Sequence, residues 1–97
     1  MHARVIIGAF QQDKVDEAIK ITRDFILPAV KQQKGFKKYL ALTDYATGKS
    51  MNIVLWNSEA DMMASDNSEV YREQVAKVVP FFAGSLIREH YEVVVQG

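Results

Sequence analysis

The sequence contains no cysteine, which excludes disulfide bonds, thiolate metal sites and cysteine nucleophiles. It also has no excess of charge, because 12 Lys and Arg residues balance 12 Asp and Glu residues. Nothing in this balance indicates capture of nucleic acid or of an anionic membrane, and neither partner is expected. No apolar run approaches the length of a membrane span, and the N-terminal residues lack the pattern of a signal peptide. We therefore expect a cytoplasmic protein.

The chain has 97 residues, and 48% of them are hydrophobic. This length fits one domain covering residues 1–97. A domain of this size buries a limited fraction of its surface. Some apolar residues should therefore remain on the surface, where a second copy of the chain could cover them, and we expect a homodimer.

Four segments with a strand-like composition divide the chain: residues 3–10, 36–44, 51–56 and 86–95. Apolar residues at helical spacing fill the gap between the first two, where Pro28 should kink or restart the helix and Gly35 should end it. A short turn around Gly48 predicts that the second and third strands form an antiparallel hairpin. Ser58 and Asp61 resemble a capping box, which predicts the start of a second helical region.

The predicted order is β-α-β-β-α-β. Such a chain forms the ferredoxin-like α+β fold, a four-stranded antiparallel sheet with both helices on one face. The other face then needs cover, which a second copy of the sheet would provide. The candidates for that face are apolar: Val5, Ile7, Leu40, Leu42, Ile53 and Leu55. Strand alternation alone does not decide which set of residues faces the helices.

Two short motifs add a resemblance to this pattern. Gly35-Phe36 opens the second strand, and the run Trp56-Asn57-Ser58-Glu59-Ala60 joins the third strand to a helix. With the element order, they make the whole chain resemble the antibiotic biosynthesis monooxygenase (ABM) family of the dimeric α/β-barrel superfamily. The resemblance implies a homodimer paired sheet to sheet, with a pocket between the sheet and helices of each subunit.

The resemblance also implies a chemistry. Family members that oxidise polycyclic phenols to quinones use no metal or flavin, and they carry an Asn and a Trp four residues apart on the third strand. Asn52 and Trp56 have this spacing, and strand alternation places both on one face. Those enzymes also have a Tyr six residues after the Trp, where this chain has Met62. Haem-degrading members have a ligating His on the second helical region, but this chain has no His between Met62 and Phe82, which argues against haem degradation.

Asn52 and Trp56 are therefore the candidate catalytic residues. An amide and an indole N–H can stabilise an oxyanion in a dry pocket. The alternatives are structural: Trp56 as a core or corner residue, and Asn52 facing solvent or the dimer partner.

The candidate substrate-binding residues are Tyr39, Met62, Met63 and Tyr91. The competing interpretation, which the residue types favour, makes the two methionines gap-fillers in the core and the two tyrosines ordinary strand residues. His90 is the only internal histidine, and we interpret it as a structural or interface residue rather than a general base.

RNA-recognition domains share this strand order, but their third strand carries a Lys/Arg-Gly-Phe/Tyr pattern that KSMNIVLW lacks. The sequence thus predicts a cofactor-independent monooxygenase acting on a hydroquinone- or polyphenol-type aromatic. The alternative is a non-catalytic dimeric module of the same fold that binds a small apolar ligand or a partner.

Overall fold

The computed structural model describes residues 1–97 and contains the predicted four strands in one sheet. The strands are β1 (His2–Ala9), β2 (Phe36–Thr43), β3 (Lys49–Trp56) and β4 (Ile87–Glu92). They lie in the order β2-β3-β1-β4, and each neighbouring pair is antiparallel. This is the predicted ferredoxin-like arrangement, with β4 three residues shorter at its C-terminal end than the sequence indicated.

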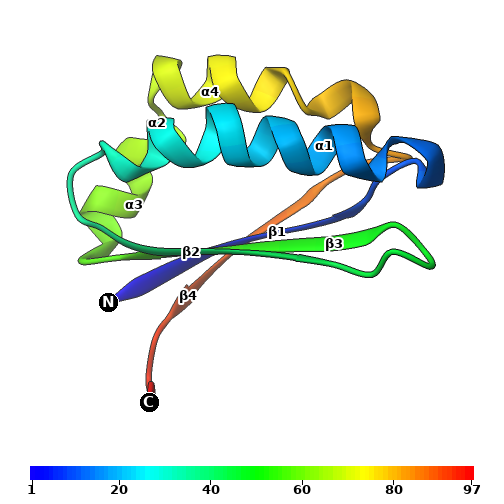
Figure 1. Ribbon diagram of the computed structural model, residues 1–97. Helices are drawn as coiled ribbons and strands as arrows, with labels where there is room; N and C mark the ends of the chain where they lie inside the picture. The colour runs from blue at the N-terminus through cyan, green and yellow to red at the C-terminus, as the bar shows by residue number, and fades with distance from the viewer.

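The first helical region runs without interruption past Pro28 (Figure 1). Its segments are η1 (Gln12–Lys14), α1 (Val15–Ile21), the π-helical η2 (Thr22–Ile26) and α2 (Leu27–Lys31). The N–H of Leu27 bonds to the Thr22 carbonyl, which widens the turn just before the proline. Because proline donates no N–H, a widened turn lets the helix resume at α2 rather than end.

Two serines begin the later helices, α3 (Glu59–Asp66) and α4 (Glu69–Ala76). Ser58 Oγ accepts from the N–H of Asp61 at 3.1 Å, and Ser68 Oγ accepts from the N–H of Tyr71 at 3.3 Å. The first of these is the predicted cap. A short η3 turn (Val79–Phe81) leads to β4. None of the helices is long and apolar enough to cross a bilayer.

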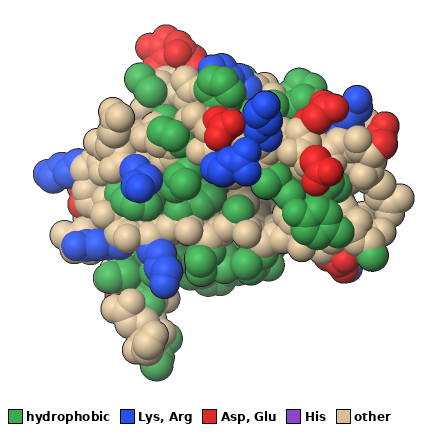
Figure 2. Space-filling model, in the orientation of Figure 1, with side chains coloured by type: hydrophobic (Ala, Val, Ile, Leu, Met, Phe, Trp, Pro, Cys, Tyr) green, Lys and Arg blue, Asp and Glu red, His purple; other side chains and the backbone are tan.

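The helices cover one face of the sheet and leave the other open (Figure 1). Register decides which residues face which side: Asn52 pairs with Ile6 and Ala41, and the adjacent Ile53 pairs with Val5 and Leu40. All six apolar candidates share the face away from the helices. Leu40 and Leu42 are 40% and 48% exposed there. Hydrophobic side chains show along this underside in the space-filling view (Figure 2).

The β2–β3 turn holds the end of β1 in place. Gly48 has a φ of 80°, a conformation that favours glycine, and its carbonyl accepts from the N–H of Phe10 at 2.8 Å. This bond fixes the point where the chain leaves the sheet for the first helix.

Candidate functional site

Asn52 and Tyr39 stand next to each other on the helix-covered face of the sheet. Asn52 is in the middle of β3, and its partner on β2 is Ala41, two residues from Tyr39. Because side chains alternate along a strand, Tyr39 and Ala41 point to the same side as Asn52. The edge strand β2 and its neighbour β3 therefore present a phenol and an amide together beneath the helices.

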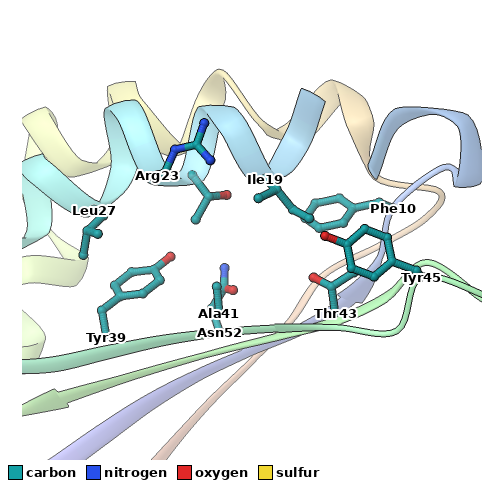
Figure 3. A pocket seen from close by; sticks show the side chains of 10 residues that line it. Phe10, Ile19, Arg23, Leu27, Tyr39, Ala41, Thr43, Tyr45 and Asn52 are labelled. Carbon is teal, nitrogen blue, oxygen red and sulfur yellow. The ribbon is translucent and has the colours of Figure 1, made fainter. Parts of the chain in front are cut away.

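A cavity of about 390 Å³ lies between this pair and the first helical region, and we call it the first cavity. Figure 3 shows Tyr39 and Asn52 rising from the sheet toward Arg23, Ile19 and Leu27 on the helix. The remaining walls come from the sheet, the β2–β3 turn and the helix: Phe10, Thr22, Ala41, Thr43 and Tyr45. Its volume lies at the lower end of the usual range for small-molecule sites, roughly 300–1,000 Å³.

The first cavity offers hydrogen-bond donors rather than a carboxylate. Burial, together with the neighbouring Tyr71, raises the pKa of Tyr39, and the Arg4 charge offsets this only in part. Tyr39 is therefore a neutral O–H donor at physiological pH. The Asn52 side chain makes no hydrogen bond within the chain, so its amide is free to bind a ligand. Arg23 adds a cation, with its Nε 3.2 Å from Asp24 Oδ1.

A second cavity of about 290 Å³ lies on the other side of Tyr39 and Asn52, toward α4 and β4. Its walls are mostly apolar: Ile6, Ile26, Val54, Val75, Val78, Phe82 and Leu86. Tyr71 and Arg88 also line it. Since Tyr39 and Asn52 line both cavities, these two side chains form the partition between them.

Trp56 shares the face of Asn52, as predicted, but it lines neither cavity. Its side chain is fully buried, and its Nε1 has no hydrogen-bond partner. The Arg4 guanidinium carbon lies 5.2 Å from the Trp56 ring centre, and the Phe36 ring meets it edge-on at 6.2 Å. Four residues of strand separate it from Asn52 by about 13 Å along the backbone. The structure therefore does not bring the two predicted catalytic side chains together in one cavity.

Comparison with solved structures identifies the architecture. One similar structure is a protein of Nitrosomonas europaea provisionally named an antibiotic biosynthesis monooxygenase (TM-score 0.81, 14% identity, covering 98% of this chain and 100% of that one). Another, from Caulobacter crescentus, carries the same provisional name (TM-score 0.82, 18% identity, covering 97% and 90%). A third is a mutant of SnoaB, a cofactor-independent oxygenase from Streptomyces nogalater (TM-score 0.77, 8% identity, covering 98% and 94%). The chain has the ABM fold. No family model matches the sequence, and no curated protein matches it either.

Within the ABM fold, three of the predicted substrate-binding residues lie outside both cavities. Met62 is 1% exposed and belongs to the hydrophobic core. Met63, the next residue on α3, points outward and is 42% exposed. Tyr91 pairs with Ala3 on the open face of the sheet and is 50% exposed. Tyr39 is the one member of the predicted set that lines a cavity.

Sequence reasoning missed a buried charge cluster. Arg4 is fully buried on β1, and its Nη1 donates to Asp66 Oδ1 at 2.7 Å and to Ser65 Oγ at 3.0 Å. His90 Nε2 lies 2.8 Å from the other oxygen, Asp66 Oδ2. The Arg4 guanidinium carbon also lies 4.2 Å from the Tyr71 ring centre. An arginine inside an apolar strand was the available signal, but its acidic partner is 62 residues away in the sequence.

Proposed function

We propose that this chain is an ABM-family monooxygenase that oxidises an electron-rich aromatic, of hydroquinone or polyphenol type, in the first cavity. The observation that carries the proposal is Asn52, whose unpaired amide lies beside the neutral Tyr39 phenol in the cavity wall. The shared fold with a cofactor-independent oxygenase adds support. Fold alone does not determine chemistry, so the site carries the argument.

The reaction needs little from the protein beyond binding and electrostatics. A bound phenolate reduces dioxygen itself; one oxygen atom enters the ring, the other leaves as water, and the substrate supplies the electrons. Asn52 and Tyr39 would donate hydrogen bonds to the substrate oxyanion, and Arg23 would favour its charge. The helix above the cavity would limit access of water. In this proposal Trp56 packs against Arg4 and Phe36 rather than contacting the substrate.

Oxygen uptake with phenols and hydroquinones, with a chelator present and no added flavin, tests this proposal. Isotope-labelled dioxygen then distinguishes insertion of one oxygen atom into the product from simple reduction of oxygen to peroxide. No uptake above the uncatalysed rate with a panel of such substrates would overturn the proposal.

The alternative is a non-catalytic module that binds a small apolar ligand in the same cavity. Met62 favours it, because it stands where the resemblance implies a tyrosine and lies in the core instead of the cavity. Ligand binding without oxygen uptake would establish this alternative.

We further propose that the protein is a homodimer paired through its open sheet faces. The support is the apolar face described above, to which Met51 and Ile87 also contribute. An apolar sheet face without helices is stabilised when another layer covers it. A second copy of the same face is self-complementary and closes as a two-fold dimer.

A further inference from the structure

The second cavity contains a cation that the structure does not pair. Arg88 is on β4, next to Ile6 of β1, and it lines the wall of the cavity. Arg4, Arg23 and Arg72 each bond to an acidic or carbonyl oxygen. The Arg88 side chain makes no hydrogen bond and no ion pair within the chain.

Arg88 is an exposed residue of β4, and it lines the same cavity as Tyr71. Burial raises the pKa of Tyr71, while the positive charges of Arg4 and Arg88 oppose that rise and Asp66 adds to it. Arg88 is therefore near enough to Tyr71 for its charge to influence the phenol. Tyr71 remains a neutral O–H donor in the same wall.

Arg4 and Asp66 form an ion pair behind Tyr71, so their charges offset each other locally. This leaves Arg88 as the charge in the cavity wall without a counter-ion. Apart from Tyr39, Asn52 and Tyr71, the rest of that wall is apolar. An apolar site with one cation and three neutral donors matches an apolar molecule that carries one anionic group.

We propose that the second cavity is an anion-binding subsite for the ligand that the first cavity accepts, with Arg88 as its anchor. The ligand class is an aromatic ring system that bears a carboxylate. Guanidinium and carboxylate match in geometry, and a charge-assisted pair is stronger than a neutral one. The inference rests on the proposed function in one respect: a ligand must bind in the cavities between the helices and the sheet. The partition of Tyr39 and Asn52 would then contact the ligand between its ring and its carboxylate.

Two probes that differ by a single carboxylate test the subsite: 1-hydroxy-2-naphthoate and 1-naphthol. Their dissociation constants are measured by calorimetry at pH 7.5 for the parent, Arg88→Gln and Arg88→Lys. Lys38→Gln is the matched control, because it removes one positive charge from the same sheet and Lys38 lines neither cavity. A hydrogen bond to a charged group corresponds to about a tenfold or larger change in affinity.

We expect the parent and Lys38→Gln to prefer the carboxylate probe by about tenfold or more. Arg88→Gln should bring the two affinities to within about threefold while leaving 1-naphthol binding unchanged, and Arg88→Lys should keep part of the preference. Equal binding of both probes to the parent, or an unchanged preference in Arg88→Gln, would overturn the subsite and leave the first cavity as a binding site. Failure of the parent to bind either probe would count against the subsite and the proposed function together.

Discussion

His90 on β4 and Asp66 at the end of α3 are joined by a 2.8 Å contact between His90 Nε2 and Asp66 Oδ2. The second oxygen of Asp66 accepts from Arg4 on β1, so one carboxylate ties two strands to a helix. Asp66 is 4% exposed and Arg4 is 0% exposed. A charge buried to this extent is stable only while its partners remain, because removing one leaves the other without solvation.

Asp66→Ala should therefore destabilise the protein severely, by about 3–5 kcal/mol, since it leaves the Arg4 guanidinium without a counter-ion. His90→Ala should cost clearly less, because its side chain is 35% exposed and the Arg4–Asp66 pair survives. Chemical denaturation measures both values. Glu73→Ala on the exposed side of α4 is the control and should stay within about 0.5 kcal/mol of the parent. Equal costs for Asp66→Ala and Glu73→Ala would show that the buried pair does not contribute to stability.

Asn52→Ala and Trp56→Phe distinguish a catalytic role from a structural role for each residue of this pair. Asn52→Ala removes a donor from the cavity wall, so turnover should fall about 10²- to 10³-fold. Stability should change by less than about 1 kcal/mol, because the amide has no partner in the chain to leave unsatisfied. Trp56→Phe should keep turnover near the parent value while the melting temperature falls. Steady-state oxygen uptake and thermal melts of the same preparations provide the comparison. A large loss of turnover in folded Trp56→Phe would contradict this prediction and show that the indole takes part in catalysis.

The phenols of Tyr39 and Tyr71 predict a loss of stability at alkaline pH. Folding raises the pKa of Tyr39 above its ordinary value of 10.0, chiefly through burial, and burial also raises the pKa of Tyr71. Above pH 10 the unfolded chain releases these protons while the folded chain keeps them, so stability falls as pH rises. Each such tyrosine contributes a slope of up to about 1.4 kcal/mol per pH unit.

Urea denaturation between pH 9.5 and 11.5 measures this slope. Tyr39→Phe and Tyr71→Phe should each make it shallower, because each removes one retained proton from the folded state. Tyr45, which is 66% exposed, provides the control substitution Tyr45→Phe. Identical slopes for the parent, Tyr39→Phe and Tyr71→Phe would contradict this prediction.

Substitution on the open sheet face tests the proposed dimer. Leu42→Lys places a charge on a face that must become buried, so the dimer should dissociate at micromolar concentration. Val70→Lys makes the same kind of change on α4, where the side chain is 58% exposed and far from that face. Sedimentation equilibrium should show a monomer for Leu42→Lys and a dimer for the parent and Val70→Lys. A monomeric parent would overturn the dimer proposal.

The order of elements could be predicted because the signals that set it are local. Ser58 caps α3 as its spacing to Asp61 indicated, and Gly48 takes the positive φ that a tight hairpin turn needs. Strand period and helix period are likewise properties of neighbouring residues. Such features require no knowledge of what lies across the fold.

Only the tertiary structure decided which face each strand residue takes and what it meets there. Asn52 and Trp56 share a face and a motif, yet one borders two cavities and the other lies in the core. Arg4 is buried because Asp66 reaches it from α3, a partner that no local spacing indicates. The physical reason is that burial and ion pairing depend on contacts between distant segments, whereas caps, turns and periodicity depend on residues a few positions apart.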